Sequence, residues 1–210
     1  MRHEKIVLNE ERNVYLTSYI VEDGEAEAKP ALLVLPGGGY FICADREGEP
    51  VALSFCGYGF NCFVLHYSVN DEERMPGNDA WPNPLEDYDQ AMEYIKEHAA
   101  EFKVDPERIA AAGFSAGGHL ALSAAVSAKN RPKAAILGYP VTGYNERYYE
   151  GRFNCLAHVS EDTCPCFIFA AAGDPVVKIE NSIKLMQALA DFGVPFESHI
   201  YAKGPHAFST

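Results

Sequence analysis

The chain has 210 residues, of which 48% are hydrophobic and 22% are charged, and these values are typical of an ordinary globular protein. Its formal net charge of −13 repels phosphates, so we expect no nucleic-acid partner and no binding to a membrane surface. No apolar stretch approaches the roughly 18 residues that a membrane-spanning helix needs. The length predicts one domain over residues 1–210.

The first residues and the cysteines indicate the cellular compartment. Residues 1–5 are largely charged, and the apolar run at 6–8 is too short for the core of a signal peptide. We therefore expect a cytoplasmic protein. The six cysteines lack metal-site spacing, and in the closest pair, Cys164 and Cys166, only one residue intervenes. We expect all six to be reduced and mostly buried, with no metal site.

Strands are predicted along the whole chain. The first two are expected at residues 4–8 and 13–21, before a turn around Gly24. Six short apolar runs bounded by Gly or Pro follow, which is the pattern of buried parallel strands. These runs cover residues 31–35, 61–67, 109–113, 133–138, 166–171 and 195–201.

Helical patterns lie between these strands. Apolar residues recur every three or four positions over residues 85–102, where Asn83 is expected to cap the helix and Pro84 to begin it. Residues 116–127 are small and apolar. A third helix over 179–190 should end near Gly193. The alternation predicts an α/β protein with a doubly wound, mostly parallel sheet and helices on both faces.

The strongest motif is G-F-S-A-G at residues 113–117, which fits the G-x-S-x-G pattern of a nucleophile elbow. A serine between a strand and a helix needs small neighbours, because the chain turns there in a strained conformation. The expected strand before Ser115 and the expected helix after it supply that context. Ser115 is therefore predicted to be a nucleophile, and the alternative is a glycine-rich turn with an idle serine.

Acyl transfer also needs backbone donors for an oxyanion. The amide of Ala116 follows the nucleophile, and a loop with three consecutive glycines follows the strand at 31–35. Gly38 and Gly39 of this loop are the candidates for the second donor. A flexible turn is the alternative. A phosphate-binding loop is disfavoured because no G-K-[ST] follows.

The general base and its acid partner should come late in the chain, in the order serine, acid, histidine. Of the seven histidines, His206 follows the last expected strand, whereas His119 is expected to be a packed histidine on the helix that Ser115 opens. Asp174 follows the penultimate strand, where it can orient the imidazole. The predicted catalytic set is Ser115, Asp174 and His206.

Three aromatic residues are candidates for substrate binding: Tyr40 after the glycines, Trp81 near two prolines, and Tyr144. Tyr144 belongs to an aromatic segment that can stack on a sugar or line an acyl pocket. The alternatives for this segment are packing on its own surface and a contact in a homodimer.

Together these features resemble the small acetyl-esterase and lipase-like branch of the α/β-hydrolases, many members of which are described as xylan or carbohydrate esterases. The resemblance covers most of the chain from residue 31. It is carried by residues 35–40 with 45–50, 104–109 running into the elbow, 173–177 with 180–182, and 193–195 through 204–208.

The resemblance implies the same triad, deacylation of small esters such as acetylated sugars, and no metal or organic cofactor. Pro36 stands where many such esterases have a histidine, and the segment at 141–164 is short for a cap. We therefore expect a minimal cap or none, and an open or small acyl pocket. An amidase, peptidase or formamidase with the same triad is an alternative, as is a binding protein on the same fold.

Overall fold

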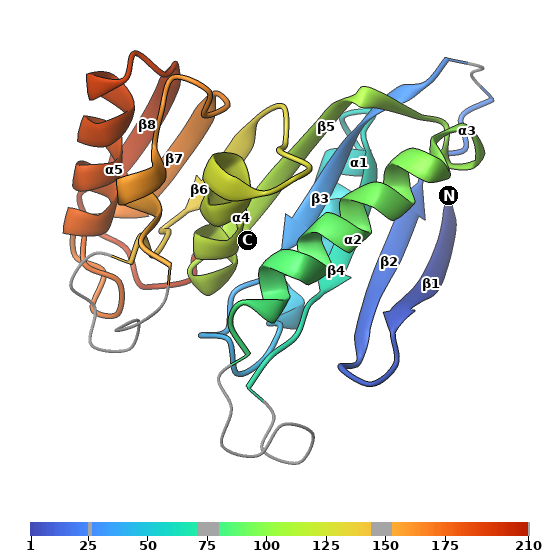
Figure 1. Ribbon diagram of the computed structural model, residues 1–210, viewed down its shortest axis with the longest axis horizontal. Helices are drawn as coiled ribbons and strands as arrows, with labels where there is room; N and C mark the ends of the chain where they lie inside the picture. Colours follow the sequence, from blue (N-terminus) through green and yellow to red (C-terminus); the bar gives the residue numbers. More distant parts are fainter. Residues whose placement is uncertain (25–26, 71–79, 144–152, 210) are drawn as a thin grey trace.

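The computed structural model describes residues 1–24, 27–70, 80–143 and 153–209. Within these residues, eight strands form one sheet in the order β1-β2-β4-β3-β5-β6-β7-β8 (Figure 1). The strands are β1 (Arg2–Asn9), β2 (Val14–Ile20), β3 (Lys29–Leu35), β4 (Asn61–His66), β5 (Val104–Phe114), β6 (Ala135–Gly138), β7 (Cys166–Ala171) and β8 (Phe196–Tyr201).

The sheet is antiparallel only at its N-terminal edge. β1 pairs antiparallel with β2 and β2 with β4, whereas every later pair is parallel. Strand order reverses around β3, which lies between β4 and β5. The predicted doubly wound, mostly parallel sheet is confirmed. In such a sheet, loops beyond the carboxyl ends of the central strands lie close together.

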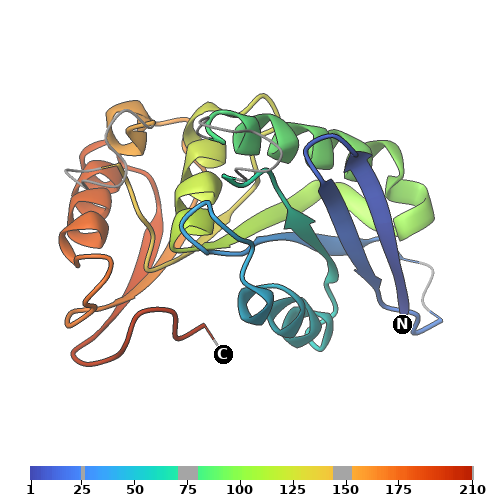
Figure 2. The ribbon, with the colours of Figure 1, turned by 90° about the horizontal axis from the view of Figure 1, so that it is seen from below.

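Helices cover both faces, as Figure 2 shows. α1 (Glu49–Cys56) lies on one face, beside the last residues of the chain. The other face carries α2 (Asn83–Glu97), α3 (Ala99–Phe102), α4 (Ala116–Ser127) and α5 (Glu180–Asp191). Two short 3₁₀ helices, Asp45–Glu47 and Cys155–His158, lie in the connections.

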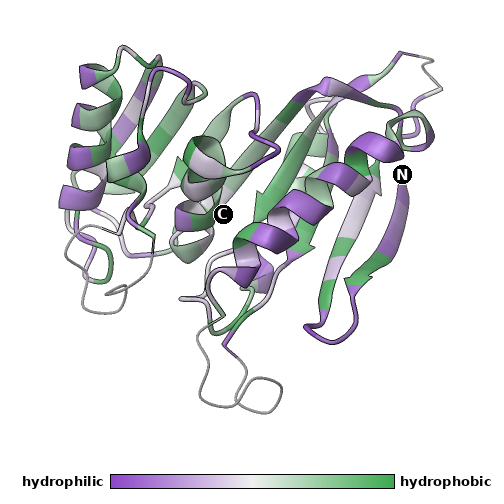
Figure 3. Cartoon of the chain, viewed as in Figure 1, coloured by the Kyte–Doolittle hydropathy of each residue, from purple (hydrophilic) through white to green (hydrophobic). Residues whose placement is uncertain are grey.

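The core follows the hydropathy of the central strands. Residues 31–35 of β3 are fully buried, and Figure 3 shows β3, β4 and β5 as mostly hydrophobic, while α2 carries hydrophilic residues on its outer side. Every residue of α4 except Ser127 is buried. The small side chains of α4 therefore allow it to pack closely between the sheet and its neighbours.

The helices differ from the prediction in three respects. α2 begins at Asn83 with Pro82 before it, so Asn83 is the first helical residue rather than the cap. The helix expected over 85–102 is divided at His98, whose backbone leaves the helical conformation. α1 was not predicted, because its eight residues bury only Val51 and Ala52 and give a weak periodic pattern.

The predicted minimal cap concerns the segment at 141–164. The described part of this segment includes the 3₁₀ helix Cys155–His158, and residues 144–152 lie outside the described ranges. In the ranges that the structure describes, no helix has the length and apolar character that crossing a membrane requires.

The turn after β5 yields a stability prediction. A Cβ on Gly113 would lie 2.1 Å from the carbonyl oxygen of Gly117 and 2.8 Å from Ala121 Cβ. Gly113→Ala should therefore lower the free energy of unfolding by about 1–3 kcal/mol or more, measured by urea denaturation. Gly173→Ala is the control, because no atom lies within 4 Å of its added Cβ, and it should change stability by less than about 0.5 kcal/mol. Equal effects of the two substitutions would contradict this packing.

Candidate active site

Ser115 lies at the sharp turn between β5 and α4. Its φ of 54° and ψ of −116° form a strained conformation for a residue with a side chain. The backbone holds the turn from two sides. The Ser115 amide donates to Gly138 O at 2.9 Å, and the Ser115 carbonyl accepts from the His119 amide at 3.0 Å. The hydroxyl is thereby presented at the carboxyl edge of the sheet.

His206 lies in the loop after β8 and contacts both other predicted triad residues. Its Nε2 is 3.0 Å from Ser115 Oγ, and its Nδ1 is 2.7 Å from Asp174 Oδ2. A carboxylate only accepts hydrogen bonds, so Nδ1 donates to Asp174. In the neutral imidazole, Nε2 is then free to accept the Ser115 hydroxyl.

The Asp174 carboxylate is held by its own loop. Its Oδ1 accepts the amides of Val176 and Val177 at 2.8 and 3.0 Å, and its side chain is only 1% exposed. The Asp174 amide donates to Ala171 O at 3.2 Å, which ties the turn to the end of β7. One carboxylate oxygen is thus fixed by the backbone, and the other is left for His206.

The glycine-rich loop after β3 lies against the serine. A Cβ on Gly37 would be 3.1 Å from Ser115 Cβ and 2.7 Å from Phe114 O, so only glycine permits this approach. Gly38 and Gly39 have φ values of +131° and +67°, in the region that favours glycine. The Gly38 carbonyl accepts the amides of Phe41 and Ile42, and this closes the loop.

Two further features concern the predicted oxyanion donors. Ala116 is the first residue of α4, where the amides of the first turn have no partner within the helix and carry partial positive charge. The Gly37 amide donates to Glu47 Oε2 at 2.7 Å and is therefore already engaged. The roles of Gly38, Gly39 and Ala116 as oxyanion donors stay predictions.

The structure places the side chain of Tyr40, a predicted substrate-binding residue, in the interior of the fold. Its φ of +65° turns the ring into the interior, where it is fully buried and its hydroxyl donates to His119 Nδ1 at 2.8 Å. His119 in turn donates from Nε2 to Phe153 O at 2.8 Å. Tyr40 therefore packs behind the loop, and His119 is the packed helix histidine that the sequence predicts.

The other two substrate-binding candidates have different outcomes. Trp81 is partly exposed and packs edge-on against His119, with ring centroids 5.1 Å apart, and its binding role stays a prediction. Tyr144 lies outside the described residues.

Sequence reasoning missed a buried pair beside the triad. Glu47 is 1% exposed, and its Oε1 accepts the Tyr139 hydroxyl at 2.7 Å. The Tyr139 ring lies edge-on to the His206 ring, with centroids 5.0 Å apart. Residues 45–50 carry part of the family resemblance, but no pattern in the sequence connects Glu47 with Tyr139, so only the folded structure reveals this contact.

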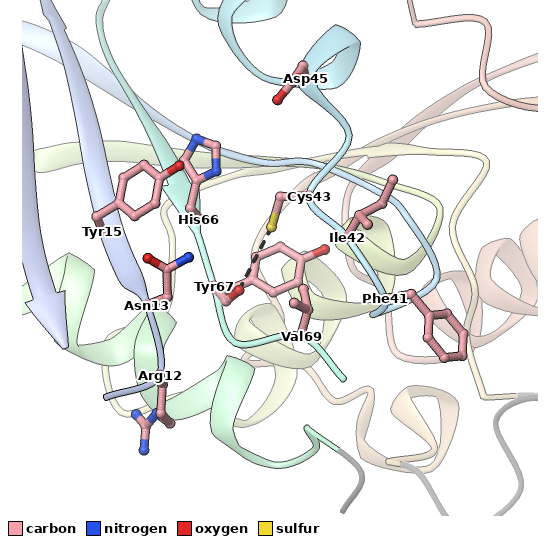
Figure 4. Close-up of a pocket in the computed structure, with 10 residues that line it drawn as sticks. All are labelled: Arg12, Asn13, Tyr15, Phe41, Ile42, Cys43, Asp45, His66, Tyr67 and Val69. Atoms are coloured by element: carbon pink, nitrogen blue, oxygen red, sulfur yellow. Dashed lines mark hydrogen bonds between the residues drawn. The ribbon is translucent and has the colours of Figure 1, made fainter. Parts of the chain in front are cut away.

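A cavity of about 290 Å³ opens on the outer side of the glycine-rich loop. Figure 4 shows Tyr15 and His66 on one side of it and Cys43 and Ile42 on the other. Two residues of its lining are hydrogen-bonded to each other: Cys43 Sγ donates to Tyr67 O at 3.8 Å. None of the predicted triad residues lines it, so this cavity does not surround Ser115 Oγ.

A nucleophile elbow, an acid after β7 and a histidine after β8, on a sheet of this order, define an α/β-hydrolase. The profile of the BD-FAE family matches residues 18–136, which is more than half of the chain, and the chain belongs to this family.

Relatives and solved structures agree with this assignment. The chain is 31% identical to endo-1,4-beta-xylanase B of Butyrivibrio fibrisolvens over 86% of its own length and 33% of the xylanase. It superposes on the crystal structure of MGS-M1, an α/β-hydrolase enzyme from a Medee basin deep-sea metagenome library, with a TM-score of 0.88. The sequence identity to MGS-M1 is 37%, and the match covers 100% of this chain and 84% of the MGS-M1 chain.

A third match is the acetyl ester-xyloside bifunctional hydrolase of Caldicellulosiruptor lactoaceticus, with a TM-score of 0.84 and 30% identity over 98% of this chain and 88% of that structure. The chain spans between 33% and 49% of the length of four curated relatives that it matches.

The reactivity of the cysteine thiols tests the prediction that most cysteines are buried. Burial raises the pKa of both Cys43 and Cys155 to about 12, so only about one thiol in ten thousand is ionised at pH 8. In contrast, a hydrogen bond with Cys62 lowers the pKa of half-buried Cys56. Iodoacetamide at pH 8 should label Cys56 in the native protein before Cys43 or Cys155, as peptide mass spectrometry would show. Rapid labelling of Cys155 would contradict its buried position.

Proposed function

We propose that this protein is a serine hydrolase that cleaves small carboxylic esters, of the acetyl-ester or acetylated-carbohydrate type, through an acyl-enzyme. The observation that carries the proposal is the unbroken hydrogen-bonded chain from Ser115 Oγ through His206 to Asp174, at 3.0 and 2.7 Å. Such a chain prepares a hydroxyl for attack on a carbonyl carbon.

The first half of the reaction forms the acyl-enzyme. Ser115 Oγ bonds to the ester carbonyl carbon as His206 Nε2 takes its proton, and Asp174 stabilises the imidazolium. The carbonyl oxygen becomes an oxyanion that the amides of Gly38, Gly39 and Ala116 stabilise. The bond to the alcohol oxygen then breaks, and His206 returns the proton to the departing alcohol.

The second half restores the serine. Water takes the place of the alcohol, and His206 Nε2 accepts its proton as the water oxygen attacks the acyl carbon. The bond from Ser115 Oγ to that carbon breaks, and His206 protonates Oγ. The products are a carboxylic acid and an alcohol, and the free enzyme is regenerated with atoms and charges balanced.

The substrate class rests on the family and on two relatives. One solved relative is named an acetyl ester-xyloside hydrolase, and one curated relative is named a xylanase. Phe41 and Ile42, whose apolar side chains are exposed, follow Tyr40 after the glycines, where they can contact the acyl or the alcohol portion of an ester. We propose a small-molecule ester as the ligand, with an acetyl group preferred.

Steady-state hydrolysis tests this function. Ser115→Ala should lower kcat/KM for p-nitrophenyl acetate by about 10⁴-fold or more, because the attacking oxygen is lost. Ser127→Ala is the matched control, since Ser127 is exposed at the far end of α4 and donates only to Ser123 O. It should retain full activity.

Related substrates define the class of bond. p-Nitrophenyl acetate and acetylated xylo-oligosaccharides should be cleaved faster than the butyrate ester and the p-nitroanilide of acetate. Faster cleavage of the anilide would identify an amidase with the same residues. Equal hydrolysis by wild type and Ser115→Ala would contradict the assignment of the nucleophile, and no activity in either would favour a binding protein.

A further inference from the structure

Glu47 is a buried carboxylate for which the triad mechanism has no use. It ends the 3₁₀ helix Asp45–Glu47 and is 1% exposed. Burying a carboxylate costs several kcal/mol unless both oxygens find donors. Both do so here: Oε2 accepts the Gly37 amide and Oε1 accepts the Tyr139 hydroxyl, each at 2.7 Å.

The first contact fixes the glycine-rich loop. A Cβ on Gly37 would lie 2.5 Å from Glu47 Oε2, so the carboxylate approaches only because the residue is glycine. On the other side, the Tyr67 hydroxyl donates to the carbonyl of Pro36. The peptide group between Pro36 and Gly37 is therefore held from both directions, and the orientation of the next amides depends on it.

The second contact of Glu47, with the Tyr139 hydroxyl, connects it to the proposed base His206. Burial raises the pKa of the Tyr139 phenol, so the hydroxyl keeps its proton and always donates to Glu47. Tyr139 has a positive φ of 36°, and its amide donates to Phe169 O, which fixes the ring against His206 at a centroid distance of 5.0 Å. The His206 imidazole is thus hydrogen-bonded to Asp174 at one edge and packed against the Tyr139 ring.

We infer that Glu47 is a positioning residue that sets the oxyanion loop through Gly37 and supports His206 through Tyr139. This inference rests on the proposed function. A single carboxylate connects the two groups that must act together when Ser115 Oγ attacks: the oxyanion donors and the base. Displacing reacting groups by about 1 Å costs on the order of 100-fold in rate.

Kinetics of two variants test the consequence. Glu47→Ala should lower kcat for p-nitrophenyl acetate by about 10- to 100-fold while KM changes less than about twofold, because transition-state contacts are lost and ground-state binding is not. Glu47→Gln keeps the shape, so its amide oxygen can accept from Gly37 and its NH₂ can donate to Tyr139. It should recover most of the lost kcat.

A matched variant separates positioning from general destabilisation. Asn61 is fully buried and bonds to the backbone of Val21 and Phe102, at the opposite end of the sheet. Asn61→Ala should lower the melting temperature as Glu47→Ala does, while kcat stays within about twofold of wild type. Equal losses of kcat in these two variants would overturn the inference, and so would a rise in KM at unchanged kcat in Glu47→Ala.

Hydrogen exchange followed by mass spectrometry tests the positioning without any assay of activity. Glu47→Ala should speed exchange in peptides that cover residues 37–44 and 204–208, whereas Asn61→Ala and Glu47→Gln should not. Unchanged exchange at 37–44 would overturn the inference. Failure of the proposed function is seen separately, as equal hydrolysis by wild type and Ser115→Ala, and in that case the exchange result alone judges the role of Glu47.

Discussion

The close contact between the start of α4 and the end of β3 is the constraint on which the rest of the site depends. A Cβ on Gly117 would lie 2.0 Å from Leu35 O and 2.4 Å from Pro36 O, so no larger residue fits. Because these backbones touch, Ser115 is forced into its strained turn and the loop after β3 is brought against it. The strain is local, and it is sustained by a sheet whose central strands are fully buried.

The site also depends on the parallel pairing of five strands, β3, β5, β6, β7 and β8. Their carboxyl ends lie along one edge, so three loops that are far apart in the sequence meet there. Ser115, Asp174 and His206 come from these ends. We propose that Glu47, which no strand carries, then connects the loop after β3 to the loop after β8.

Much of this arrangement could be predicted from the sequence, because the information is local. The apolar runs at 31–35 and 166–171 correspond to β3, which is buried on both faces, and to β7, and α4 begins directly after the elbow serine, as the motif requires. α5 ends at Asp191, near Gly193 as predicted, and Gly193 has a φ of +67°, in the left-handed region that favours glycine. Because the predicted triad residues follow β5, β7 and β8, they occur along the chain in the order serine, acid, histidine.

What could not be predicted depends on tertiary contacts. Tyr40 follows a glycine motif, and nothing local shows that its ring turns inward to His119. Glu47 lies in a segment that carries the family resemblance, but its role is not visible until Gly37 and Tyr139 are seen to donate to it. α1 is short and buries two residues, so its period is too weak to detect. For Tyr40 and Glu47, the partners His119 and Tyr139 are distant in the sequence.

Labelling with a fluorophosphonate tests the central claim most directly, because a serine attacks its phosphorus only when a base and oxyanion donors surround the hydroxyl. Intact mass and peptide mass spectrometry would locate the phosphonyl group that replaces fluoride. We predict one group per chain, on the peptide that contains Ser115, and loss of labelling in His206→Ala. Labelling of a different residue, or an unreactive wild-type protein, would contradict the proposal that Ser115 and His206 form a working nucleophile and base.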